Sequence, residues 1–182
     1  MSLLQAIGTQ LARFLTKEHL HNDSYYRISI DDIKSTLKPG DVVLVEGQSR
    51  VSAAIQFITN SNWSHAAIFI GKKETLNHCL IEVKAVEGCI FTDINAYMHH
   101  NLRICRPIFL NKRKRKLLVD HLIKKIGSKY DLKNIIDLIR YIYPNPPVPK
   151  KFRRNLIGIG AGSPTKAICS SLIAEAFKEI DH

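Results

Sequence analysis

The spacing of apolar residues is helical in some parts of the chain and typical of strands in others. Near the beginning of the chain, the helical spacing predicts short helices. Apolar residues between positions 3 and 15 recur every three or four residues, which indicates an amphipathic helix. Packing on the domain is favoured, and a helix that lies on a membrane is the alternative. After a polar break, Ser29 and Asp32 form a capping-type start for a second helix. Pro39 and Gly40 then end this helix, because both residue types are typical of turns.

The middle of the chain has the β-branched and apolar runs that are typical of short strands. Such runs are found at 42–45, 66–70, 80–84, 89–92 and 102–106. A helical segment at 51–59 separates the first two runs, and Gly71 is expected to end the second. The connections are too short for crossover helices, so we expect a largely antiparallel sheet of about five strands.

Helical periodicity returns in the second half of the chain. Helices are predicted at 117–126, 132–143 and 170–180. Between the last two lie a proline-rich stretch at 144–149 and a glycine-rich loop at 158–164. Helices, then strands, then helices are the order of elements in an α+β fold.

The composition is that of one globular domain. The chain has 182 residues, of which 45% are apolar and 24% charged, so it can bury a sizeable core. No run approaches the roughly 18 apolar residues of a membrane-spanning helix. Residues 1–10 lack the basic region and unbroken apolar stretch of a signal peptide. The location stays open between the cytoplasm, a membrane surface and, if a signal was removed, the cell envelope.

Cysteine is the first residue type that points to chemistry. None of the four cysteines forms a Cys-x-x-Cys pair, which favours reduced thiols over disulfides. Cys79, Cys89 and Cys105 lie in or beside apolar strands, where a thiol is usually inert. Cys169 instead opens a helix, where unpaired N–H groups stabilise a thiolate and lower its pKa. The alternative is a buried first-turn cysteine without a chemical role.

A thiolate nucleophile needs a base, and the base needs an orienting partner. His65 is the best candidate base, because it lies where the polar loop 60–64 meets a buried strand. Glu82 interrupts an apolar strand, where a carboxylate requires a partner, and it can reach the far nitrogen of His65 if the two strands pair. The alternatives are a structural histidine and an edge-strand glutamate that faces water.

These residues stand in motifs that resemble a known family. The segments LKPGDVVL at 37–44 and WSHAAIFIG at 63–71 resemble the strands of NlpC-like papain-fold cysteine peptidases. In the usual members the cysteine helix precedes the histidine, whereas here ICSSL at 168–172 follows it. That order is similar to the circularly permuted branch, which includes YiiX-like proteins and the lecithin:retinol acyltransferase group.

Two further segments extend the resemblance to about residues 37–178. Residues 81–90 resemble the branch's strand pair after the histidine, and GSKYD at 127–131 resembles its G-x-x-Y-D segment. Ile168 and Ser170 flank the cysteine where acyltransferase members have a different environment, which favours the YiiX-like side. The resemblance implies a permuted papain-like fold, with residues 1–36 as an N-terminal helical extension and 37–182 as the catalytic domain.

The activity that the resemblance implies is acyl transfer from an amide or ester. Cys169 is the expected nucleophile, His65 the base and then acid, and Glu82 the residue that fixes the histidine tautomer. Substrate-binding roles are expected for Tyr130, Trp63 and Ser64, although a tyrosine in that position is more often a packing residue. No cofactor is expected. No metal site is expected either, because the pair His99-His100 lacks a second ligand cluster.

The formal charge of +11 predicts an anionic partner without identifying it. Two basic runs, at 112–116 and 150–154, are expected either to be solvated or to dock on an anionic membrane or envelope polymer. If they converge at the mouth of the cleft, they would recruit an anionic substrate. Nucleic acid is disfavoured because no recognition motif is present. The main hypothesis is a thiol hydrolase of amide bonds; the alternatives are a non-catalytic papain-like binding module and an acyltransferase. The oligomeric state stays open.

Overall fold

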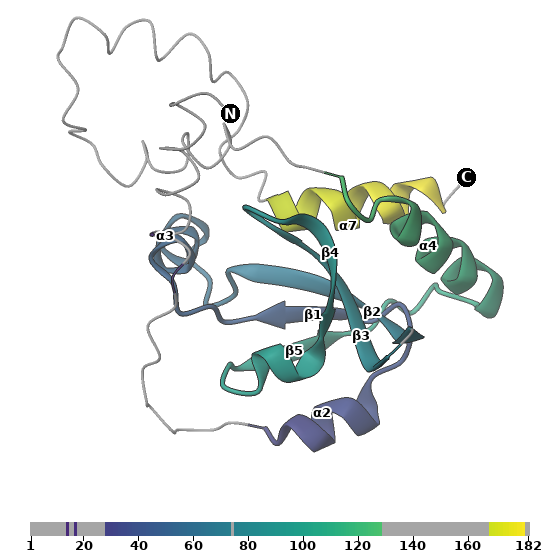
Figure 1. Cartoon of the computed structure of the whole chain (residues 1–182), viewed down its shortest axis with the longest axis horizontal. Helices are drawn as coiled ribbons and strands as arrows, with labels where there is room; N and C mark the ends of the chain where they lie inside the picture. Colours follow the sequence, from purple (N-terminus) through teal and green to yellow (C-terminus); the bar gives the residue numbers. More distant parts are fainter. Residues whose placement is uncertain (1–13, 15–16, 18–27, 74, 129–167, 181–182) are drawn as a thin grey trace, which may run out of the picture.

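The computed structural model describes residues 28–73, 75–128 and 168–180, together with Phe14 and Lys17. The elements are, in order, α2 (Ile30–Thr36), β1 (Val42–Val45), α3 (Arg50–Thr59), β2 (His65–Lys73), β3 (Leu76–Lys84), β4 (Gly88–Asp93), the 3₁₀-helix η1 (Ile94–Tyr97), β5 (Leu102–Cys105), α4 (Lys112–Lys124) and α7 (Ile168–Glu179) (Figure 1). The predicted α+β class is confirmed.

The strands form one five-stranded antiparallel sheet in the order β4-β3-β2-β1-β5. Val45 lies opposite His65 on one side and Leu102 on the other, and Val42 lies opposite Ile68 and Cys105. The sheet therefore has two ends, which we name the His65 end and the Cys105 end. The antiparallel pairing agrees with the prediction from the short connections.

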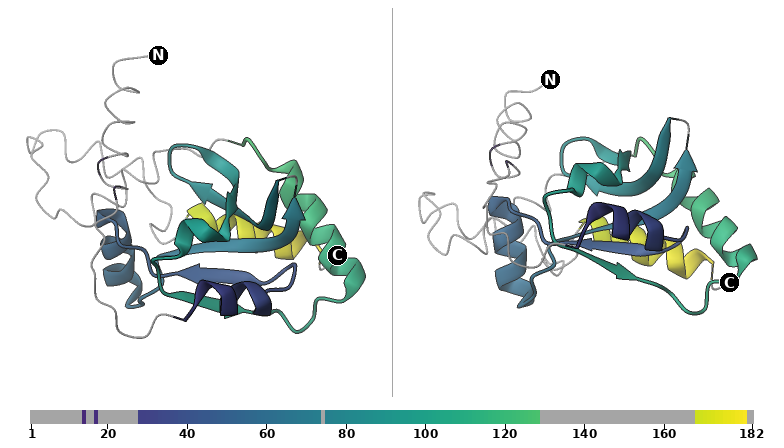
Figure 2. Two further views of the ribbon diagram at one scale, coloured as in Figure 1. Left: turned by 60° about the horizontal axis from the view of Figure 1, so that its bottom comes forward. Right: turned by 90° about the horizontal axis from the view of Figure 1, so that it is seen from below.

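Alternation of side chains divides the core into two layers, one on each face of the sheet. Ile68 and Ile70 of β2 face α4 and α7, which lie side by side, and they pack with Leu172 and Ala176 of α7. Ala67 and Phe69 face the opposite side, where α2 and η1 cover the sheet (Figure 2). We name these the α7 face and the α2 face.

The end of β2 and the beginning of β3 differ from the prediction, since β3 begins at Leu76 and not at residue 80. Gly71 was expected to end β2, but the strand continues to Lys73. Phe69 pairs with Leu80 and Gly71 with Cys79, so Ile70 is an extra residue at a β-bulge. Gly71 has φ +94°, a left-handed backbone that glycine adopts without strain, and the strand passes through it instead of stopping.

The Pro-Gly-Asp turn before β1 contacts the segment that follows β5. Asp41 is 2% exposed, and its carboxylate accepts hydrogen bonds from Arg106 Nε at 2.9 Å and Arg106 Nη2 at 2.7 Å. The Lys38 N–H also donates to Asp41 Oδ2 at 2.8 Å. Gly40 has φ +92°, and a Cβ atom there would lie 2.9 Å from Leu110 Cδ1. The turn therefore holds the segment that follows β5 against the start of β1.

Several predicted segments lie outside the described residues: the helix at 3–15 apart from Phe14, the helix at 132–143, and the stretches 144–149 and 158–164. Ile33 of α2 packs in the core beside Val43, so this helix is part of the folded body. The domain boundary between residues 36 and 37 stays a prediction. In the part of the chain that the structure describes, no helix is long and apolar enough to cross a membrane.

Candidate active site

His65 lies at the beginning of β2, and the two residues before it fix where the strand starts. The Ser64 N–H donates to the carbonyl of Val45 at 3.1 Å, and the buried Ser64 hydroxyl accepts from the Gly47 N–H at 3.0 Å. These contacts give Ser64 a structural role, and its expected substrate-binding role stays a prediction. Trp63 is half-buried beside it, and the Trp63 backbone N–H donates to Ser61 Oγ at 3.2 Å.

The pairing of β2 with β3 brings Glu82 to His65. Ile68 lies opposite Ile81, which places Ala67 opposite Glu82 and puts His65 on the same face of the sheet. His65 Nε2 is 2.5 Å from Glu82 Oε2, while the Glu82 side chain is fully buried and that of His65 is 22% exposed. The contact expected from the sequence is present, and it is made through Nε2.

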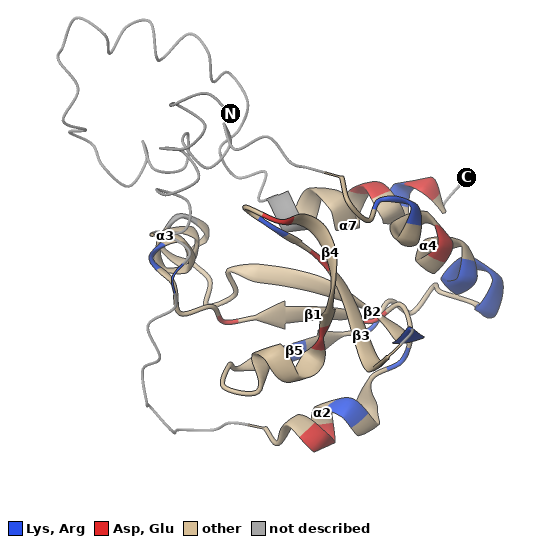
Figure 3. Ribbon diagram, in the orientation of Figure 1, with Lys and Arg blue, Asp and Glu red and all other residues tan. Residues whose placement is uncertain are grey.

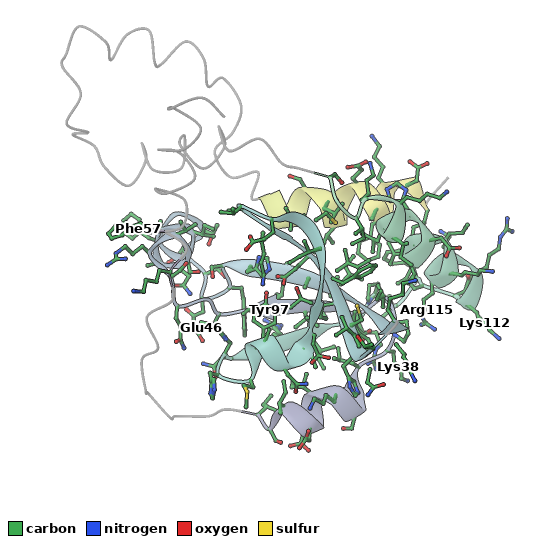
Figure 4. The ribbon with its side chains drawn as sticks, viewed as in Figure 1. Lys38, Glu46, Phe57, Tyr97, Lys112 and Arg115 are labelled. Carbon is green, nitrogen blue, oxygen red and sulfur yellow. The ribbon has the colours of Figure 1, made fainter. Side chains whose placement is uncertain are left out.

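Glu82 has further partners that the sequence analysis did not predict. The Tyr97 hydroxyl of η1 donates to the same Oε2 atom, and Lys84 Nζ lies 3.5 Å from Oε1. The Tyr97 ring also lies beside the rings of His65, at 6.2 Å between centroids, and His100, at 5.5 Å. Figure 4 shows Tyr97 reaching from η1 towards the sheet. The carboxylate is thus held by groups from three elements.

These partners keep Glu82 ionised. Burial alone raises the pKa of this carboxyl, but the hydrogen bond and the charge of His65 act in the opposite direction, with smaller contributions from the Thr92 and Tyr97 hydroxyls. The sum lowers the pKa of Glu82 from 4.5 to about 2. A carboxylate that stays charged beside an imidazole stabilises the imidazolium and fixes the ring tautomer.

Glu82→Gln is expected to lower the free energy of unfolding at pH 7 by about 3 kcal/mol, because the carboxylate ionises more readily in the folded protein. The folded pKa of about 2 lies below the ordinary value of 4.5, so the stabilisation is complete above pH 4.5. It is lost as the pH falls towards 2. Denaturant titrations at several pH values would measure this difference, which should shrink on acidification.

The matched control is Glu87→Gln, since Glu87 is exposed in the turn between β3 and β4. Its loss should change stability by no more than about 0.5 kcal/mol at any pH. A difference between Glu82→Gln and the parent that is independent of pH between 3 and 7 would show that the glutamate acts through packing alone.

The three cysteines with described side chains form no disulfide, and two of them are fully buried. Cys79 and Cys89 have no exposed surface. Burial, followed by the nearby Glu82 charge, raises the pKa of Cys89 to about 11, although Lys125 opposes this. Cys105 is half-buried at the Cys105 end of the sheet.

Cys169 lies in the first turn of α7, as the sequence predicts. Residues 169, 172, 176 and 180 share one helical stripe, and Leu172, Ala176 and Ile180 of that stripe are buried against the sheet. Residue 169 therefore lies one helical turn before Leu172, at the N-terminal end of this stripe. The figures place this start of α7 over the His65 end of the sheet (Figures 1 and 2). The side chain of Cys169, and the whole of Tyr130, lie outside the described residues.

The two halves of the candidate site approach from different faces. α7 covers one face of the sheet, whereas Glu82 and Tyr97 lie on the α2 face. His65 is the first residue of its strand, so it lies at the rim of the sheet, where a group from either face can meet it. The start of α7 and the His65–Glu82 pair therefore both lie at the His65 end of the sheet.

The donor sets of the described residues do not suggest a metal centre. In residues 28–73, 75–128 and 170–180, no group of three or more His, Cys, Asp or Glu side chains is arranged to hold an ion. His65 and Glu82 contact each other directly through Nε2 and Oε2.

Comparison with known proteins supports the same fold and chemistry. Residues 36–143 match the family described as permuted papain-like amidase enzyme, YaeF/YiiX, C92 family; this segment contains His65, Glu82 and Tyr97 and ends before Cys169. The fold is similar to the crystal structure of a protein described as metalloprotein YiiX from Escherichia coli O157:H7, with a TM-score of 0.53, 17% identity and 79% of this chain covered. The chain spans 66% of that protein's length. Among curated proteins, the sequence has no significant match.

Proposed function

The chain belongs to the C92 family of permuted papain-like amidases, and from this premise we propose that Cys169, His65 and Glu82 hydrolyse an amide bond through an acyl-enzyme. Family membership makes the protein a papain-like cysteine hydrolase of amide bonds. The observation that carries the finer proposal is the contact of 2.5 Å between His65 Nε2 and the buried Glu82 carboxylate, at the end of the sheet where α7 begins.

In the proposed reaction, the Cys169 thiolate attacks the carbonyl carbon of the amide. The His65 imidazolium gives its Nδ1 proton to the departing amine, the C–N bond breaks, and a thioester with Cys169 remains. A water molecule then attacks the thioester, His65 accepts the proton of that water at Nδ1, and the thiolate leaves. The N–H groups at the start of α7 are the donors proposed for the oxyanion.

Glu82 acts on this reaction through His65. Its carboxylate accepts the hydrogen bond of Nε2–H, which holds the ring in the tautomer that directs Nδ1 to the thiol. Tyr97 and Lys84 hold the two carboxylate oxygens, so Glu82 stays in one orientation when the imidazole changes charge. We assign these two residues a positioning role. Trp63, half-buried next to this pair, remains a proposed contact for the substrate.

An acyl-enzyme trap tests the proposal without knowledge of the natural substrate. Incubation of the full chain with p-nitrophenyl acetate should release a burst of p-nitrophenol equal to the enzyme concentration and leave one acetyl group on the peptide that contains Cys169. Free acetate should remain the main product when a simple amine is added, since water is the proposed acceptor. Acetyl transfer mainly to the amine would instead identify an acyltransferase.

A Cys105→Ala variant serves as the control, because it removes a half-buried thiol at the opposite end of the sheet. It should keep the burst in full. Acetylation that is spread over lysines, with no adduct on Cys169, would refute the thiol mechanism while leaving the family assignment intact.

A further inference from the structure

The segment between β5 and α4, together with α4 itself, exposes three large apolar side chains. Ile108 is 100% exposed and Phe109 is 50% exposed, and Leu117 of α4 is 47% exposed. Single exposed apolar residues are ordinary on protein surfaces, but a cluster of them next to charged residues is typical of an interaction site.

The protein holds this segment in place from both sides. Arg106 is bound by Asp41 through two hydrogen bonds, and its Nη2 also donates to the carbonyl of Thr36 at 2.7 Å. Leu110 is buried in the core with 8% exposure. Ile108 lies midway between these two anchors, so its outward position is fixed by the fold and is not the result of a loose loop.

The next residues place positive charge beside this apolar tip. Asn111 caps α4 by accepting a hydrogen bond from the Lys114 N–H at 2.8 Å, and the basic run 112–116 forms the first turns of the helix. Lys112, Arg113 and Lys116 are exposed. Figure 3 shows the lysine and arginine positions at the start of α4 in blue. Asp120 is the acidic residue that shares a shallow depression with them. We name Ile108, Phe109, Lys112, Arg113, Lys116 and Leu117 the docking surface.

We propose that this docking surface binds the face of an anionic lipid bilayer. Lysine and arginine next to anionic headgroups each strengthen membrane association by about fivefold. An exposed aliphatic side chain between them gains by entering the boundary between headgroups and acyl chains. A nucleic acid would use the same cations, but its phosphate backbone offers no contact that requires a fully exposed isoleucine.

The location of the docking surface separates it from the proposed active site. The chain leaves the sheet at Cys105, so the run at 112–116 begins beyond the Cys105 end, away from His65. Convergence of the two basic runs at the mouth of the cleft stays a prediction, because residues 150–154 lie outside the described residues. The inference does not depend on the proposed function.

Binding of the full chain to vesicles tests the proposal. The parent should bind vesicles of phosphatidylcholine with about one third phosphatidylserine, and binding should weaken as salt is raised. Lys112→Gln with Arg113→Gln should reduce the partition coefficient more than tenfold. Ile108→Ser should reduce it severalfold, and this residue makes no intramolecular contact that a serine would disturb, since it is fully exposed.

Two matched variants separate the docking surface from general charge and hydrophobicity. Arg50→Gln with Arg103→Gln removes two exposed cations on α3 and β5, and Ile28→Ser removes an isoleucine that is 62% exposed elsewhere. Both should bind within about threefold of the parent. An equal loss in the controls, no effect of Ile108→Ser, or tighter binding to duplex DNA than to vesicles would each overturn the proposal. The p-nitrophenol burst of Ile108→Ser should equal that of the parent, which keeps this test distinct from the test of catalysis.

Discussion

Cys169→Ala should abolish hydrolysis of amide and activated ester substrates, with kcat/KM lower by at least about 10³-fold, or about 4 kcal/mol of transition-state stabilisation. The reason is that the proposed reaction passes through a thioester that alanine cannot form. The same change should remove the fast phase of alkylation by iodoacetamide at neutral pH. Peptide mapping of the alkylated protein measures this directly, without a substrate.

The remaining thiols provide the comparison. Cys79 and Cys89 have no exposed surface, and the pKa of Cys89 is raised to about 11, so neither should react until the protein unfolds. Cys105 should react at the rate of an ordinary half-buried thiol. Circular dichroism and thermal unfolding of Cys169→Ala should match the parent. Labelling of all four cysteines at equal rates from pH 5 to 9 would contradict the assignment of Cys169.

The elements of the fold follow from the sequence because their signals are local. Ser29 caps α2, and the apolar runs at 42–45 and 66–70 become neighbouring strands whose order the short connections largely determine. The bulge at Ile70 escaped prediction, since it depends on the register against β3 and glycine alone does not distinguish a bulge from a stop. A strand boundary that depends on the neighbouring strand cannot be predicted from the sequence of one segment alone.

Some residues of the candidate site could likewise be predicted from the sequence, and others could not. His65 and Glu82 stand out because each is a polar residue in an apolar strand, and their contact follows once β2 and β3 are paired. Tyr97 gives no such signal: it lies in a polar-flanked segment, and only the path of η1 under the sheet brings its hydroxyl to Glu82. A buried carboxylate in a strand does, however, predict that some additional donor exists.

The position of the basic run shows why charge patterns are harder to place than strands. The sequence indicates that 112–116 carries consecutive positive charges, but the end of the domain at which they lie depends on the pairing of β5 with β1. The ion pair of Arg106 with Asp41 joins residues 65 positions apart and sets the direction of the chain into α4. Neither residue carries a local signal for that contact.

His65→Ala should lower the alkylation rate of Cys169 at neutral pH by at least about tenfold, and the rate of amide hydrolysis by about 10³-fold. The imidazole is the proposed partner that keeps the thiol ionised, and it supplies the proton to the departing amine. The alkylation rate measured against pH separates these effects, because loss of the partner should move the reactive form of Cys169 to higher pH.

The same residue permits a geometric test of how the start of α7 meets the start of β2. A His65→Cys variant should form a disulfide with Cys169 under mild oxidation, since a disulfide requires Cα atoms no more than about 7 Å apart. Lys73→Cys, at the other end of the same strand, should form none. His78→Ala is the matched control for the alkylation rate, because His78 stacks on Phe69 on the α2 face without contacting Glu82. If His65→Cys stays reduced and His65→Ala leaves the alkylation rate of Cys169 unchanged, the thiol and the His65–Glu82 pair belong to different sites, and the proposed mechanism is wrong.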